Sequence, residues 1–269
     1  MMDDILRKAE LFRNDCVIAD TPRLESEVLP DDVNVQKDLP YIDDGSENHL
    51  LDVYYVPDHK KIGECFFLIH GGAFVYGYKE LDKNFGMRLA KASELPVVNI
   101  NYTVMPDSSM LQIIDEIDKA IDYVKTRFGF KGFHFVGDSA GGYLATLSGI
   151  RYKDTLSVSS ICGCYRNDRN DFPGALFAHE GEEIPEYLYD LTTKADRLKE
   201  LKVALITGSK DFLRSENTEL SRLLDNCVFY DAEDCGGREM FHVFPIAHPE
   251  WPEGEKTLEI ISSFVRKSC

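Results

Sequence analysis

The stretch Phe133-His134-Phe135-Val136-Gly137-Asp138-Ser139-Ala140-Gly141-Gly142 decides the fold of this chain. Its mostly apolar start is typical of a buried strand, and the Ala- and Leu-rich segment after it is typical of a helix. Between them lies the pattern G-x-S-x-G. A sharp strand-to-helix turn brings backbone close on both sides, so Gly137 and Gly141 fit where other side chains would clash. The turn pushes the hydroxyl of Ser139 out of the sheet, which makes Ser139 the candidate nucleophile.

The serine pattern has a second interpretation. Serine is a common N-cap, so G-x-S-x-G alone is compatible with a glycine-rich turn that only begins a helix. The strand before the turn and the helix after it favour the catalytic interpretation. At a helix N-terminus, free N–H groups can also stabilise an oxyanion that develops beside Ser139.

A second glycine loop follows an earlier apolar run. The run Cys65–Ile69 ends in His70-Gly71-Gly72-Ala73-Phe74. Consecutive glycines let backbone N–H groups turn toward one point, as an oxyanion hole requires. Alone, this loop would be an ordinary turn with His70 as a structural hydrogen-bonding residue. Together with the Ser139 turn, the loop is interpreted as part of the same active site, in which it would supply the oxyanion hole.

Short apolar runs alternate with amphipathic segments from residue 50 onward. The expected strands are Leu51–Val56, Cys65–His70, Val97–Tyr102, Phe133–Gly137, Leu156–Cys162, Val203–Thr207 and Cys227–Tyr230. The expected helices cover residues 82–93, 109–127, 140–151, 214–225 and 254–266. This alternation predicts an α/β fold with one mostly parallel sheet covered by helices on both faces. In such folds, the loops at the carboxyl ends of the strands build the site.

With these two motifs, the chain resembles the hormone-sensitive-lipase-like branch of the α/β hydrolases, which includes bacterial acetyl esterases and carboxylesterases. The likeness rests on the loops 70–74 and 137–142 and on a C-terminal acid and histidine, and spans about residues 50–265. It implies the α/β-hydrolase fold. It also implies that the N–H groups of Gly72, Ala73 and Ala140, with Gly71 as a further candidate, form the oxyanion hole.

The chain departs from the family pattern at two places. Ala73 stands where the family loop often has a third glycine, which is harmless if only its N–H is used. After the next strand, Tyr102-Thr103-Val104-Met105-Pro106-Asp107 stands where the family often has Tyr-Arg-Leu-Ala-Pro-Glu. Tyr102 and Pro106 keep their places, whereas the arginine and the glutamate are absent.

Two segments fall outside the regular alternation. Residues 1–45 are expected to form an N-terminal arm that is helical over 2–18 and contributes to a cap. Residues 46–269 are expected to form the α/β-hydrolase domain. Within it, the segment of about 165–195 mixes charged and aromatic residues and is expected to be a cap insertion that roofs the pocket.

A serine hydroxyl at its normal pKa is a poor nucleophile and needs a base, which in this fold follows the acid in chain order. The histidines after Ser139 are His179, His242 and His248. His242, in a loop just before the last helix, resembles the family's catalytic histidine. His248 lies between prolines, and His179 falls in the expected roof, too early in the order.

The acid is expected at Asp211. It stands three residues after the glycine that ends the strand Val203–Thr207, where the fold places its triad acid. Asp231, Glu233 and Asp234 also precede His242, but they form an acidic run typical of a solvated turn.

Composition narrows the class of protein further. A net charge of −17 would repel nucleic acid and anionic lipid, so neither is an expected partner. No signal-peptide pattern and no run of about 18 apolar residues is present, which predicts a cytoplasmic protein. The seven cysteines, an odd number without zinc or thioredoxin spacing, are expected to be free thiols.

These observations predict a serine hydrolase of small, short-acyl carboxylic esters that needs no metal or cofactor. An amidase of the kynurenine formamidase type uses the same catalytic parts and stays open as an alternative. A catalytically silent small-molecule binder is a weaker alternative, because such proteins lack the catalytic histidine and this chain has one. The oligomeric state is not predicted.

Overall fold

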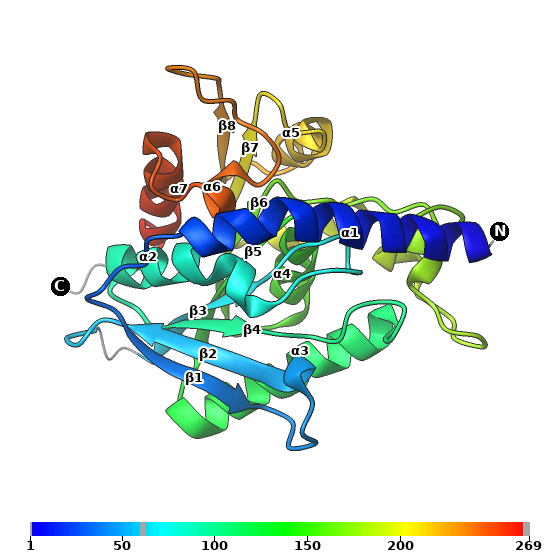
Figure 1. The fold of residues 1–269 in the computed structure, drawn as a ribbon, viewed down its shortest axis with the longest axis horizontal. Coiled ribbons are helices and arrows are strands. Elements are labelled where there is room, and N and C mark those ends of the chain that lie inside the picture. The colour runs from blue at the N-terminus through cyan, green and yellow to red at the C-terminus, as the bar shows by residue number, and fades with distance from the viewer. Residues whose placement is uncertain (1, 60–62, 266–269) are drawn as a thin grey trace.

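The computed structural model describes residues 2–59 and 63–265. Its centre is an eight-stranded sheet in the order β1-β2-β4-β3-β5-β6-β7-β8 (Figure 1). β2 runs antiparallel to both β1 and β4, and the neighbours from β4 to β8 are all parallel. The strands are β1 (Asn34–Pro40), β2 (Leu50–Tyr55), β3 (Glu64–Ile69), β4 (Val97–Ile100), β5 (Gly132–Asp138), β6 (Thr155–Ile161), β7 (Lys202–Gly208) and β8 (Cys227–Ala232). The expected mostly parallel α/β sheet is confirmed.

Helices cover both faces of the sheet. They are α1 (Met2–Ser26), α2 (Lys83–Ser93), α3 (Met110–Phe128), α4 (Ala140–Arg151), α5 (Arg214–Arg222), α6 (Phe244–Ala247) and α7 (Pro252–Ser262). Apolar residues of α3 and α4 pack on one face, against Phe67, Phe133 and Phe135. Those of α2 and α7 pack on the other face, against Phe66 and Leu68. β3 and β5 therefore lie at the centre of the protein, and every residue of β5 is buried.

The N-terminal arm is more structured than its sequence indicates. α1 continues beyond the expected 2–18 to Ser26, with Pro22 inside it, and the rest of the arm contains the edge strand β1. Residues of β1 are mostly exposed and a register shift interrupts its pairing with β2, so it lacks the apolar alternation that reveals a strand. Arg13 attaches α1 to the loops after β3 and β4, because its guanidinium donates hydrogen bonds to the carbonyls of Val75 and Met105 at 2.6 and 2.5 Å.

The segment 165–195 contains only short 3₁₀ helices: η3 (Gly174–Leu176), η4 (Glu186–Leu188) and the start of η5 (Leu191–Leu198). The Tyr143 hydroxyl on α4 donates to the Leu188 carbonyl at 2.5 Å, and Met110 N–H donates to the Phe177 carbonyl at 2.8 Å. The Glu216 carboxylate on α5 accepts the N–H of residue 165 at 2.7 Å. The segment is thus hydrogen-bonded to three helices of the domain.

Within the described residues, no helix combines the length and the apolar character needed to cross a bilayer. Six of the seven cysteines are free thiols there, and Cys65 and Cys162 are buried. Cys269, residue 1 of the expected arm and the last residue of the expected helix over 254–266 lie outside the described residues.

Candidate active site

The turn between β5 and α4 holds Ser139 in a strained backbone conformation, with φ at 50° and ψ at −116°. Neighbouring backbone crowds both flanking glycines. A Cβ on Gly141 would lie 1.9 Å from the Ile69 carbonyl oxygen, and one on Gly137 would lie 2.2 Å from the Gly141 oxygen. The glycines of the motif therefore allow β3, β5 and α4 to meet at the point where the serine projects.

Three side chains distant in sequence meet at this turn. The hydroxyl of Ser139 donates to Nε2 of His242 at 3.0 Å, and Nδ1 of His242 donates to Oδ1 of Asp211 at 2.7 Å. This is the geometry that a nucleophile, a base and an orienting acid require. These are the three residues expected from the sequence, and the structure brings them together.

The position of Asp211 is fixed by further hydrogen bonds. Thr207 Oγ1 at the end of β7 donates to Oδ2 at 2.6 Å, and the N–H of Leu213 donates to Oδ1 at 2.9 Å. Burial by itself raises the pKa of Asp211, but the bonds from His242 and Thr207 outweigh it and hold the pKa below its ordinary value. Asp211 is therefore ionised at neutral pH and can stabilise a positive imidazole.

His242 lies in a loop between β8 and α6. The exposed ring of Phe212 lies over its imidazole with ring centres 4.2 Å apart. On the buried side, the N–H of Val243 donates to Cys162 Sγ at 3.3 Å. Possible metal-ligating atoms of Cys162, Asp211 and His242 lie within 4.8 Å of one another, the one such group among the described residues. Its atoms already take part in the hydrogen bonds given above.

The other candidate bases lie elsewhere. Nδ1 of His248 pairs with Glu250 at 3.2 Å, and its ring stacks on Trp251 with centres 3.9 Å apart. His179 bonds the Pro106 carbonyl through Nε2 at 3.1 Å. Neither has a hydrogen bond to Ser139 within the described part of the chain.

The rejected acids also bond to other partners. Arg214 pairs with Asp231 and with Glu233, each at 2.8 Å. Asp234 accepts from the hydroxyl of Ser209 at 2.5 Å. None of the three is hydrogen-bonded to His242 in the residues described.

The loop after β3 has an unusual run of left-handed backbone. Gly72, Ala73 and Phe74 have φ of 101°, 51° and 63°. Among the described residues, the N–H groups of Gly72, Ala73 and Ala140 have no hydrogen-bond partner, so all three are available to an oxyanion. The N–H of Gly71 donates instead to Oδ1 of Asp138 at 2.9 Å, which removes Gly71 from the donors expected from sequence.

A buried pair of carboxyl groups, Asp82 and Asp138, lies beside this loop and was not expected from the sequence. Burial raises the pKa of Asp138 to about 6, against the lowering effects of His242 and of the Gly71 N–H. Burial and the neighbouring Asp138 also raise the pKa of Asp82 well above its ordinary value. Asp138 lies inside the serine motif and could have been noticed there, whereas nothing in the sequence around Asp82 marks it.

His70 is fully buried at the start of the same loop. Its Nδ1 donates to the Gly71 carbonyl at 2.9 Å, its ring stacks on Tyr102, and its Nε2 has no partner among the described residues. Burial is the main cause that lowers the pKa of His70 to about 4, because a second ring proton would have no acceptor.

This burial predicts a pH-dependent stability. Below its unfolded pKa of 6.5, His70 takes up a proton on unfolding, so the free energy of unfolding falls as the pH falls from 6.5 toward 4. The loss is about 3 kcal/mol. His70→Asn keeps a donor for the Gly71 carbonyl but cannot titrate. Urea unfolding of both proteins across this range should show wild type losing about 3 kcal/mol more than the variant. Parallel stability curves would contradict the buried neutral state.

A pocket of about 440 Å³ surrounds Ser139 and His242. Its wall includes Phe12, Cys16, Asp20 and Arg23 of α1, and Phe172 and Pro173 of the insertion. Figure 1 shows α1 lying across the carboxyl ends of the central strands. The pocket thus lies between the glycine loops and a roof made of two segments that fall outside the strand–helix alternation.

Comparisons with known proteins agree with this fold. A family model described as alpha/beta hydrolase fold matches residues 66–166. The carboxylesterase/phospholipase LipF of Mycobacterium tuberculosis is 23% identical over 234 residues, or 76% of this chain. The match spans 62% of LipF, so the chain covers less than two thirds of that relative.

Solved structures resemble the chain over nearly its whole length. Esterase B from Lactobacillus rhamnosis, in a structure inhibited by a tributyrin phosphonate, has a TM-score of 0.85 at 21% identity, covering 97% of this chain and 94% of that chain. An esterase from the bacterial hormone-sensitive lipase family has a TM-score of 0.71 at 18% identity, covering 90% and 86%. At these identities, the likeness establishes a common fold.

Proposed function

We propose that this chain, which has the α/β-hydrolase fold and is similar in structure to an esterase of the bacterial hormone-sensitive lipase family, hydrolyses small carboxylic esters through an acyl-enzyme on Ser139. The observation that carries the proposal is the hydrogen-bonded series from Ser139 through His242 to Asp211. The similar protein LipF is a carboxylesterase/phospholipase, which supports the same reaction class.

In the proposed reaction, Oγ of Ser139 attacks the ester carbonyl carbon while Nε2 of His242 takes its proton. Asp211 stabilises the imidazolium, and the N–H groups of Gly72, Ala73 and Ala140 hold the oxyanion. His242 returns the proton to the departing alcohol. Water then attacks the acyl-enzyme with the same base, which releases the acid and restores the serine.

Covalent labelling tests the proposed nucleophile. The hydroxyl oxygen of an activated serine attacks the phosphorus of a fluorophosphonate and displaces fluoride, so the reagent should phosphonylate the protein at Ser139 and abolish ester hydrolysis in proportion to labelling. Mass mapping of the modified peptide identifies the site. Labelling at another residue, or full activity in labelled protein, would refute the proposal. Faster turnover of N-formylkynurenine than of 4-nitrophenyl acetate would instead assign the site to an amidase of the formamidase type.

We propose that short acyl groups, acetyl to about butyryl, are preferred. Phe177, a large aromatic residue of the insertion, is buried against Phe74 and Tyr143, with ring centres 5.3 and 6.2 Å away, so it offers no apolar face to a lipid surface. The phosphonate bound to esterase B is a tributyrin analogue, which points to the same range in a protein of this fold.

A series of 4-nitrophenyl esters from acetyl to dodecanoyl tests the acyl preference. The value of kcat/KM should be highest between acetyl and butyryl, because the pocket of about 440 Å³ is also shared with the alcohol group. The optimum should stay there when the esters are presented in dispersed micelles. An optimum at octanoyl or longer, or activation at an oil–water interface, would make the insertion a lipase lid.

A further inference from the structure

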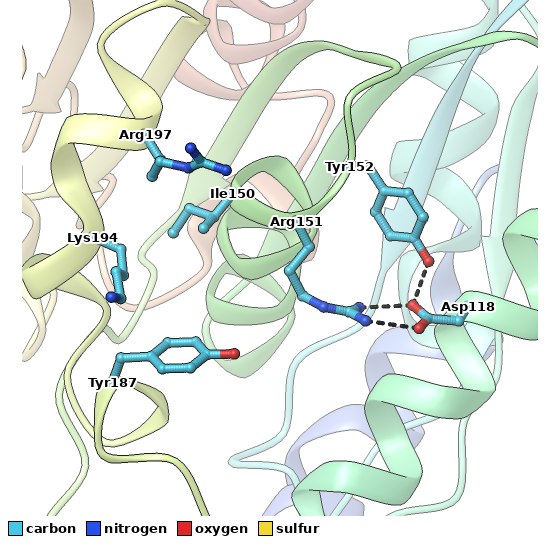
Figure 2. A pocket seen from close by; sticks show the side chains of 7 residues that line it. All are labelled: Asp118, Ile150, Arg151, Tyr152, Tyr187, Lys194 and Arg197. Carbon is cyan, nitrogen blue, oxygen red and sulfur yellow. Dashed lines mark hydrogen bonds and ion pairs between the residues drawn. The ribbon is translucent and has the colours of Figure 1, made fainter.

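A second cavity, of about 570 Å³, lies at the end of α4 opposite the nucleophile (Figure 2). α4 begins at Ala140, next to Ser139, and its last residue, Arg151, lines this cavity. The other walls come from α3, η4 and η5. The cavity shares no lining residue with the catalytic pocket, so it is a separate feature of the described structure.

Local structure directs two cations to the same side of this cavity. Lys194 and Arg197 are three residues apart in η5, and side chains at this spacing eclipse each other in a 3₁₀ helix. Leu191 and Leu198 of η5 are buried in the domain, which leaves the two cations outside. Figure 2 shows Lys194 and Arg197 on the η5 side of the cavity, with Arg151 projecting from α4.

The acid in the cavity wall is already neutralised. The carboxylate of Asp118 on α3 accepts a hydrogen bond from each terminal nitrogen of Arg151, at 2.7 Å each. It also accepts a hydrogen bond from the hydroxyl of Tyr152. In contrast, neither Lys194 nor Arg197 forms an ion pair with any described residue. Nζ of Lys194 lies over the ring of Tyr187, 5.3 Å from the ring centre. Two positive charges therefore face the cavity without an acidic partner.

This local excess contrasts with a chain of net charge −17, which contains 47 acidic and 30 basic residues. At physiological ionic strength, charges beyond about 8 Å are largely screened. The charges near the cavity therefore matter more there than the overall charge of the chain. On the η5 side, Asp196 is paired with Lys199, which leaves Lys194 and Arg197 beside it unpaired within the described part of the chain. The acid Asp122, in contrast, acts on Tyr152 of the wall. An anion on the η5 side of the cavity therefore meets two unpaired positive charges.

We propose that this cavity binds a phosphate monoester of a small organic molecule. A guanidinium such as that of Arg197 matches the oxygens of a phosphate in two parallel hydrogen bonds, and Lys194 adds a compact charge. The side chain of Ile150 and the ring of Tyr187 form an apolar part of the wall. A cavity of about 570 Å³ has room for an organic group beside the phosphate.

Phenyl phosphate, inorganic phosphate and phenol are the probes, and isothermal titration calorimetry on the full chain is the measurement. Phenyl phosphate should bind, with at least tenfold lower affinity in Arg197→Glu and in Lys194→Glu, because each loses a charge-assisted bond and gains a repulsion. The matched control is Lys256→Glu on α7, an exposed lysine paired with Glu259, which should bind like wild type. Circular dichroism verifies that the variants are folded.

Inorganic phosphate should bind more weakly than phenyl phosphate, and phenol should not bind. Equal affinities for the two anions would overturn the assignment to an ester. Undetectable binding of phenyl phosphate, or an equal loss in Lys256→Glu, would overturn the site itself. Each result is independent of ester hydrolysis, because none of the substituted residues lines the pocket of Ser139.

Discussion

Ser139→Ala should lower kcat/KM for 4-nitrophenyl acetate by about 10⁴-fold or more, because no acyl-enzyme can form without the hydroxyl. Its stability should change by less than about 1 kcal/mol, since the Ser139 side chain makes no capping bond to α4. The strained φ of 50° is also unchanged by a residue that keeps a Cβ. Steady-state kinetics and thermal unfolding provide the two measurements.

A matched control for this substitution is Ser159→Ala on β6. Its hydroxyl is buried and has no hydrogen-bond partner among the described residues. The control should keep wild-type activity, which separates the loss of the nucleophile from the loss of any buried hydroxyl. If Ser139→Ala kept more than about a percent of wild-type turnover, a different residue would be the nucleophile.

His242→Ala should be as damaging as Ser139→Ala, and the double variant should be no worse than either single one. Members of a triad act as a unit, so their losses do not add. His248→Ala is the internal control and should reduce kcat/KM only slightly, because His248 has no hydrogen bond to Ser139 in the described structure. A larger loss in His248→Ala than in His242→Ala would identify His248 as the base.

The turn at Ser139 and the buried strands could be predicted from the sequence, because each depends on a pattern of neighbouring residues. The glycines around Ser139 mark a turn that no other residue fits. The strands β3, β5 and β7 carry mostly apolar runs because both of their faces are covered. Chain order then limited the acid and the base to a few residues. Asp211 was chosen among these by its place after the strand Val203–Thr207, where the fold has its triad acid, and His242 by its resemblance to the family's catalytic histidine.

The remaining features depend on contacts between distant segments. β1 is an exposed edge strand, so its residues need not alternate between apolar and polar. Asp82 is a buried acid beside Asp138, a residue distant from it in sequence, and Asp138 accepts the N–H of Gly71. A glycine motif shows which N–H groups could turn inward, but not which one a carboxylate already occupies.

The chain contains one tryptophan, and its position provides an optical reporter without a chemical label. Trp251 stacks on His248 and meets the edge of Phe241, with ring centres 6.2 Å apart, and Phe241 directly precedes His242. Indole fluorescence depends on the rings packed around it. A displacement of the loop that carries His242 would therefore change the emission of Trp251, and stopped-flow fluorescence could follow that loop during a single turnover.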